Sequence, residues 1–177
     1  FGCCVAARGK RDTRRAPKDP ERPFAMMFTD IQSSTSLWAR APEQMGVCVE
    51  KHHDEIRALI ARFGGYEVKT IGDSFMVAFE DARNATEMAL SIQSVFYGAS
   101  WPVEIDATYQ ALAQEAEEDA MMQEGKPLRT AQNIWEEGAA YRECWNGIRV
   151  RVGLHWGMGS IKLDPVSQGY DLSLIHI

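Results

Sequence analysis

Apolar residues recur along the 177-residue chain in three patterns, and each predicts a different kind of element. Residues 24–31 are almost continuously apolar, which is typical of a central strand covered on both faces. Residues 42–63 repeat apolar side chains in steps of three and four, so a helix should begin at Pro42 and end at Gly64-Gly65. Residues 148–154 alternate apolar and polar positions, which predicts a strand with Leu154 on its buried face.

Residues 66–79 hold two short apolar runs separated by Gly72-Asp73, and this pattern predicts a β-hairpin. Glycine supplies the backbone freedom of a tight turn, and aspartate bonds its own backbone there. Asp81 should then cap a helix whose apolar face extends to Phe96. Residues 98–145 are acidic and carry turn signals, so we expect a helical insertion. The order of elements indicates an α+β domain with helices over a mixed sheet.

Asp30 lies at the exit of the first predicted strand, shortly before the hydroxyl-rich stretch 32–36. Serine and threonine are favoured as N-caps, so the strand should lead straight into a helix N-terminus. The backbone N–H groups of such a terminus suit phosphate oxygens.

Charge is unevenly distributed along the chain, which has a net charge of −6 and 45% apolar residues. Residues 1–23 contain seven Lys or Arg against three Asp or Glu. A short apolar start followed by this basic run fits either the cytoplasmic edge of a transmembrane helix or a solvated linker. The four cysteines have neither metal-ligand spacing nor a disulfide framework, so they are interpreted as free thiols.

Two aspartates, Asp30 and Asp73, follow strands in similar contexts. An isolated Gly-Asp pair is most often only a surface turn. A second acid on an adjacent strand changes this interpretation, because two facing carboxylates repel unless a cation compensates them. Mg²⁺ is commonly held by one or two carboxylates together with substrate phosphates. The pair therefore indicates two-metal phosphoryl or nucleotidyl transfer.

Three segments carry a resemblance to a known family. They are residues 28–35 (FTDIQSST), 69–76 (KTIGDSFM) and 151–157 (RVGLHWG). In this order they resemble the signature segments of a class III nucleotidyl cyclase catalytic domain. The wider chain, from about Ala16 to Asp171, is similar to the trypanosomatid receptor-type adenylyl cyclases. This resemblance implies a ferredoxin-like α+β fold, with a linker at 1–23, a catalytic domain at 24–171 and a non-matching tail at 172–177.

The resemblance also implies the residues of an active site. Asp30, Asp73 and the backbone carbonyl of Ile31 would hold two Mg²⁺ or Mn²⁺ ions, and Asp30 and Asp73 would be catalytic. Lys69 and Asp171 would select adenine over guanine by pairing one donor and one acceptor with the base, and they would serve the opposite site of a head-to-tail homodimer. Without that role, Lys69 is a solvated strand lysine. Backbone groups at Ser33, Ser34 and Thr35 would contact the phosphates of ATP.

Beyond Asp171 the chain departs from the family pattern. The family would continue with an Asn, an Arg and a Lys that act on the transition state and phosphates, so this fragment should be truncated and impaired. A receptor of this kind would reach the cytoplasmic face of the plasma or flagellar membrane through a helix missing here, and the fragment itself would be soluble. No nucleic-acid partner is expected. The alternatives left open are a guanylate or diguanylate cyclase and a non-catalytic nucleotide-binding or dimerisation domain.

The remaining conspicuous side chains are expected to pack or to be solvated. His52 lies on the apolar face of the 42–63 helix, and no histidine has a partner at metal-ligand spacing. The acidic run 115–119 should be a solvated helix face. The tryptophans, at positions 38, 101, 135, 145 and 156, are expected to pack in the core or the insertion.

Overall fold

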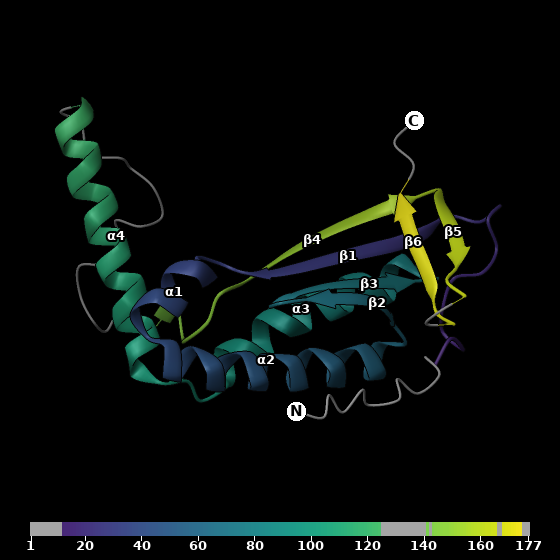
Figure 1. Ribbon diagram of the computed structural model, residues 1–177, viewed down its shortest axis with the longest axis horizontal. Coiled ribbons are helices and arrows are strands. Elements are labelled where there is room, and N and C mark those ends of the chain that lie inside the picture. Colours follow the sequence, from purple (N-terminus) through teal and green to yellow (C-terminus); the bar gives the residue numbers. More distant parts are fainter. Residues whose placement is uncertain (1–11, 125–140, 142, 166–167, 175–177) are drawn as a thin grey trace, which may run out of the picture. The chain divides into compact units, whose positions relative to one another are not determined.

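The computed structural model describes residues 12–124, 141, 143–165 and 168–174 (Figure 1). Its strands are β1 (Phe24–Ile31), β2 (Tyr66–Ile71), β3 (Ser74–Phe79), β4 (Val150–Gly157), β5 (Gly159–Leu163) and β6 (Tyr170–Leu174). Its helices are α1 (Ser34–Arg40), α2 (Pro42–Phe63), α3 (Ala82–Gly98) and α4 (Val103–Glu124). Within these described residues, no helix has the length and apolar character needed to span a bilayer.

The four-stranded sheet has the order β2-β3-β1-β4, and β5 pairs with β6 in a separate two-stranded sheet. Strand β3 lies antiparallel to both β1 and β2. In chain order the elements read βα, ββ, α, β, and this strand order is that of the predicted ferredoxin-like α+β fold. Strand β1 lies inside the sheet, which explains why its sequence is almost continuously apolar.

The described residues form two compact units. The first, here called the sheet unit, comprises the described residues of 12–30, 57–90, 152–165 and 168–174, and the second, the insertion unit, comprises those of 31–56, 91–124, 141 and 143–151. A cluster of buried side chains holds the sheet unit together: Ala16, Phe24, Met26, Tyr66, Val68, Ala78 and Leu172. Leu172, the first residue after the expected domain boundary at Asp171, is part of this core, and strand β6 continues to Leu174.

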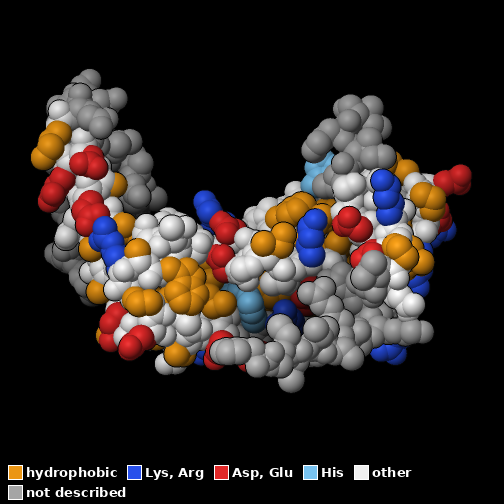
Figure 2. All heavy atoms as spheres, viewed as in Figure 1, with side chains coloured by type: hydrophobic (Ala, Val, Ile, Leu, Met, Phe, Trp, Pro, Cys, Tyr) orange, Lys and Arg blue, Asp and Glu red, His pale blue; other side chains and the backbone are white. Residues whose placement is uncertain are grey.

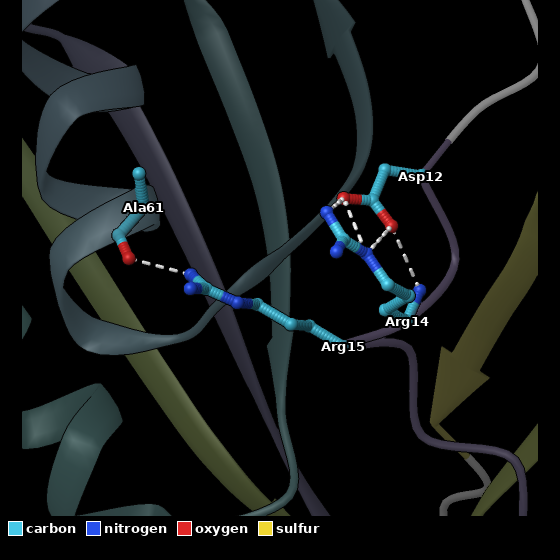
Figure 3. Close-up of polar contacts among 4 residues, drawn as sticks. All are labelled: Asp12, Arg14, Arg15 and Ala61. Carbon is cyan, nitrogen blue, oxygen red and sulfur yellow. Dashed lines mark hydrogen bonds and ion pairs between the residues drawn. The ribbon is translucent and has the colours of Figure 1, made fainter.

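The segment before β1 packs against the sheet unit at several points. Ala16 is 1% exposed, although it lies in the stretch interpreted as a linker. Arg15 donates a hydrogen bond to the carbonyl of Ala61 near the end of α2, and Arg14 forms an ion pair with Asp12 (Figure 3). The described part of the basic segment is therefore partly anchored on the domain. Residues 1–11, with Cys3 and Cys4, lie outside the described residues.

The insertion unit has its own aromatic core. His52 is fully buried and meets the ring of Phe96 edge-on, and Phe96 stacks on Trp101. The indole N–H of Trp101 donates to the Phe96 carbonyl at 2.8 Å. The prediction that His52 is a packing residue is thus confirmed. Cys48 is buried and Cys144 exposed, and both are free thiols as predicted.

Most predicted elements are present at the predicted places. Helix α2 spans Pro42–Phe63 and ends at Gly64, whose φ of 73° only glycine adopts readily. Asp81 caps α3 by accepting the N–H of Arg83 at 2.8 Å. Helix α4 confirms the helical insertion as far as Glu124. The turn signals at 125–127 and 138, together with Trp135, lie outside the described residues.

The predicted burial of three side chains is wrong. Leu154 is 42% exposed, Trp38 44% and Trp156 46%. Burial along β4 alternates only from Val150 to Gly153, and residues 154–156 are all exposed, because apolar alternation does not say whether another element covers the predicted face. Trp101 is buried as predicted. Of the acidic run, Glu115, Glu118 and Asp119 are exposed and Glu117 is half-buried.

Candidate active site

Asp30 lies at the end of β1, half-buried, where the ladder with β3 finishes. Thr29 is the register partner of Phe75, so the next position places Asp30 opposite Ser74. The Ser74 hydroxyl donates to Oδ1 of Asp30 at 3.1 Å. The buried hydroxyl of Thr29 accepts the Phe75 backbone N–H at 3.3 Å. Two side-chain hydrogen bonds therefore reinforce this end of the ladder.

The hairpin turn brings the second aspartate to the same place. Gly72 has φ 60°, the left-handed conformation that a tight hairpin turn uses, and a Cβ there would meet no other atom within 4 Å. Asp73 follows it, half-buried, and directly precedes Ser74. Since Ser74 contacts Asp30, the two predicted metal ligands lie at one end of the β1·β3 ladder. Asp73 is thus one residue away in sequence from the side chain that contacts Asp30.

Lys69 is exposed on β2, and its position depends on a bulge. Glu67 pairs with Val77 but Lys69 pairs with Met76, so β2 has one extra residue between them. A bulge of this kind redirects the following side chains. Lys69 lines a shallow hollow of about 280 Å³ together with Phe28, Thr29, Asp30, Ile71, Ser74, Phe75 and Met76. Lys69 and Asp30 therefore share one hollow of a single chain.

Asp171 does not line this hollow. It is exposed on β6, where its register partner is Lys162 on β5. The adjacent residue, Tyr170, is bound to β2: its N–H donates to the Tyr66 hydroxyl at 2.7 Å, and that hydroxyl donates to the Tyr170 carbonyl at 3.2 Å. The strand of Asp171 is thus fixed to the strand of Lys69, although the Asp171 side chain does not line the hollow that contains Lys69.

The residues after Asp30 form a turn in the insertion unit. Ile31 is buried, Ser33 and Thr35 are exposed and Ser34 is half-buried. Ser33 is the N-cap of α1, but it has φ 56° and its side chain makes no capping hydrogen bond. The predicted strand-to-helix connection is confirmed, whereas the predicted hydroxyl cap is not formed. The Gln32 N–H donates to the Arg149 carbonyl at 2.9 Å, and the Gln32 carbonyl accepts the Tyr109 hydroxyl at 2.8 Å.

The donor set at the end of β1 fits a hard divalent cation. It offers two carboxylates, from Asp30 and Asp73, and the nearby carbonyl of Ile31, all oxygen ligands of the kind that Mg²⁺ and Mn²⁺ prefer. In the described part of the chain no group of three or more His, Cys, Asp or Glu forms a metal cluster. A pair of carboxylates is nevertheless the usual protein contribution when substrate phosphates complete the coordination.

Sequence reasoning missed three supporting residues: Ser74, Thr29 and Tyr109. Ser74 directly follows Asp73, and Thr29 directly precedes Asp30. Both lie in the segments that resemble the cyclase signatures, but the sequence assigns a role to neither. Their hydroxyls act across strands, which only the register shows. Nothing in the local sequence connects Tyr109 with Gln32, which is 77 positions away.

Comparison with known proteins gives a consistent result. The profile of the family described as "Adenylate and Guanylate cyclase catalytic domain" matches residues 17–172. The chain is 45% identical over 163 residues, 91% of its length, to a receptor-type adenylate cyclase of Trypanosoma equiperdum. It is 42% identical over 170 residues to receptor-type adenylate cyclase B of Leishmania donovani. The chain spans only 33% and 12% of the length of these two curated relatives.

Solved structures show the same likeness. The fold is similar to an adenylate cyclase of Trypanosoma brucei, solved in its monomeric state, with a TM-score of 0.81 and 41% identity. That match covers 92% of this chain and 68% of the solved one. A guanylyl cyclase domain from Blastocladiella emersonii shares the fold at 17% identity and a TM-score of 0.55. The predicted α+β cyclase fold is therefore confirmed.

Proposed function

The chain belongs to the adenylate and guanylate cyclase catalytic domain family, and from that premise we propose that it is part of an adenylate cyclase that converts ATP to 3′,5′-cyclic AMP and pyrophosphate. The observation that carries the proposal is the hydrogen bond at 3.1 Å from Ser74, the residue directly after Asp73, to Asp30 at the end of the β1·β3 ladder. The receptor-type adenylate cyclases that are 40–45% identical to this chain support it.

In this proposal Asp30, Asp73 and the Ile31 carbonyl hold two Mg²⁺ or Mn²⁺ ions. Such ions lower the cost of deprotonating the ribose 3′-hydroxyl and neutralise charge on the departing pyrophosphate. The chain's own contribution is to present the carboxylates at a fixed place, because Asp30 is oriented by Ser74 and Asp73 by the hairpin turn. The backbone at Ser33, Ser34 and Thr35 binds phosphate oxygens in the same proposal.

Base selection is assigned to Lys69 and Asp171, which both lie in the sheet unit and are both exposed in a single chain. A cationic donor and a carboxylate acceptor complement N1 and the N6 amino group of adenine. The contact between Tyr66 and Tyr170 supports this pairing, since it fixes β6 against β2. ATP rather than GTP is therefore the proposed substrate.

A head-to-tail homodimer is the proposed working form. Several large apolar side chains of the sheet unit are exposed: Phe28 (46%), Ile71 (69%), Leu154 (42%) and Trp156 (46%). Hydrophobic side chains gather at the surface over β1 and β4 (Figure 2). Exposed apolar patches of this kind commonly mark interaction sites. Phe28 and Ile71 line the hollow that contains Lys69, so a second chain packed there would meet the base-selecting lysine.

We place the full-length protein at the cytoplasmic face of the plasma or flagellar membrane, as part of a receptor. The support is that relatives named as receptor-type cyclases are much longer than the matched segment. In this arrangement the catalytic part receives its signal through the chain that precedes residue 12.

The first experiment identifies the product. A version extended to the reach of the solved relatives, incubated with Mn²⁺ and either ATP or GTP, should form cyclic AMP. Formation of cyclic GMP alone would assign the guanylate cyclase alternative. No cyclic nucleotide from a folded protein would favour the non-catalytic alternative.

The second experiment tests the two carboxylates. Asp73→Ala should abolish turnover without lowering the unfolding temperature, because the side chain is a ligand and not part of the core. Asp54→Ala, which removes an exposed acid from α2, is the matched control and should keep the parental rate. A retained rate in Asp73→Ala would refute the metal assignment.

The third experiment tests the shared site. Asp73→Ala and Lys69→Ala should each be inactive alone, because each lacks one half of every site. Their mixture should recover about a quarter of parental activity, since half of randomly formed dimers are mixed and each mixed dimer has one complete site. A mixture as inactive as its components would show that Asp73 and Lys69 serve the same chain's site.

A further inference from the structure

Three hydrogen bonds form a closed circuit in the insertion unit. The Gln32 N–H donates to the Arg149 carbonyl at 2.9 Å, and the Arg149 N–H donates to the Tyr109 hydroxyl oxygen at 3.4 Å. The Tyr109 hydroxyl in turn donates to the Gln32 carbonyl at 2.8 Å. Both backbone polar groups of Gln32 are thus held, one by Arg149, the residue directly before β4, and one by the insertion helix α4.

This circuit sets the direction of the neighbouring peptide. In a trans peptide the N–H and the C=O point to opposite sides. The peptide between Ile31 and Gln32 contributes the N–H that points at Arg149, so its carbonyl, that of Ile31, is directed away from Arg149. This is the carbonyl assigned above as a metal ligand. Loss of the Tyr109 contact would release the next peptide and allow this one to rotate.

Tyr109 itself is firmly fixed. It is 3% exposed, and the guanidinium of Arg149 lies 4.0 Å from its ring centroid and 4.4 Å from that of Trp145. One turn earlier in α4, the buried Asp106 carboxylate accepts the Gly147 N–H at 2.9 Å and the Tyr141 hydroxyl. Burial raises the pKa of Tyr109 to about 12, so its hydroxyl remains a donor at any physiological pH.

A second contact joins α4 to the far end of α1. Arg40, in the last turn of α1, forms a bidentate ion pair with Glu115 at 2.9 and 2.7 Å. This pair lowers the pKa of Glu115. Helix α4 therefore contacts the chain both just before α1 and at its end, and Tyr109 makes the buried contact of the two.

We propose that Tyr109 is a positioning residue that fixes the orientation of the Ile31 carbonyl, the carbonyl assigned above as a metal ligand, and that loss of its hydroxyl weakens metal binding. The inference rests on the proposed function, because it assigns Ile31 to the metal site. Outer contacts that orient a metal ligand commonly change metal affinity when they are removed.

The test measures Mn²⁺ affinity of the full-length protein by electron paramagnetic resonance, which counts unbound Mn²⁺. Tyr109→Phe keeps the ring against Arg149 and removes only the hydroxyl, and it should weaken Mn²⁺ binding about fivefold. Tyr97→Phe is the control, because that exposed tyrosine of the same unit donates to the Glu143 carbonyl, away from the turn. The control should bind Mn²⁺ as the parent does.

Three outcomes are decisive. Unchanged Mn²⁺ affinity in Tyr109→Phe, even with a lower unfolding temperature, would reduce Tyr109 to a structural role and overturn the inference. Asp30→Asn must lower Mn²⁺ affinity in the same assay, and its failure to do so would overturn the proposed function together with the inference. If Tyr109→Phe does not fold, Tyr109→Met fills a similar volume without a hydroxyl and decides the question by the same criterion.

Discussion

Replacing Ser74 with alanine removes one hydroxyl from the proposed metal site and changes little else. Ser74 is the first residue of β3 and donates to Oδ1 of Asp30 at 3.1 Å. Without this bond the Asp30 carboxylate rotates more freely. Part of the free energy of cation binding is then spent on ordering the carboxylate. We therefore expect weaker metal binding by a protein that still folds.

The magnitude follows from the burial of the two groups. A hydrogen bond to a charged acceptor contributes about 1.5–3 kcal/mol to stability. Ser74 and Asp30 are both half-buried, so water partly replaces the bond and about 1 kcal/mol is a reasonable share. Because about 1.4 kcal/mol corresponds to a factor of ten, Ser74→Ala should raise the half-saturating Mn²⁺ concentration about fivefold.

The assay is a Mn²⁺ titration of cyclic AMP formation at saturating ATP, together with Mn²⁺ binding by electron paramagnetic resonance. Thr70→Val is a matched control, since Thr70 lies on the same hairpin and donates to another carboxylate, that of Glu67, at 2.7 Å. Ser74→Thr should restore Mn²⁺ affinity, because the hydroxyl returns. Equal Mn²⁺ dependence in Ser74→Ala and Thr70→Val would refute the reasoning.

Three further predictions concern stability and assembly. Gly147 has φ 65°, and a Cβ there would lie 2.0 Å from Trp101. Gly147→Ala should therefore lower the free energy of unfolding, measured by urea denaturation, by about 2–4 kcal/mol. The control Gly98→Ala should be nearly neutral, because no atom lies within 4 Å of the added Cβ. Burial raises the pKa of Cys48 to about 11, above its ordinary value of 9.0, so the stability it contributes is complete below pH 9 and is lost toward pH 11. Cys48→Ala should flatten that part of a stability–pH profile, and an unchanged slope would exclude the thiol as its origin. Phe28→Asp should shift sedimentation toward the monomer and lower the cyclase rate with an unchanged unfolding temperature, whereas an unaltered dimer would remove Phe28 from the interface.

The sequence predicts those parts of the fold that depend on neighbouring residues. The apolar steps of α2, its end at Gly64 and the hairpin turn at Gly72-Asp73 are all local features, and the structure has each at the predicted place. The places of Asp30 near the end of β1 and of Asp73 in the turn before β3 are local features too, and the sequence predicts both.

Contacts that depend on register or on distant segments could not be predicted. The extra residue at Val68 shifts Lys69 by one position, and apolar alternation does not reveal such a bulge. The circuit through Tyr109 joins residues from three separate stretches of the chain. The exposure of Leu154 and Trp156 differs from the prediction, because apolar residues on a strand do not by themselves say which other element covers them.

The Tyr66 hydroxyl bonds both backbone groups of Tyr170, whereas the Ser74 hydroxyl bonds Asp30. These two anchors share no residue, so substitutions at one should add independently to substitutions at the other. If the proposed roles hold, a change of the purine-selecting residues on β2 and β6 should therefore leave the metal affinity of Asp30 and Asp73 unaltered, and the two properties could be engineered separately.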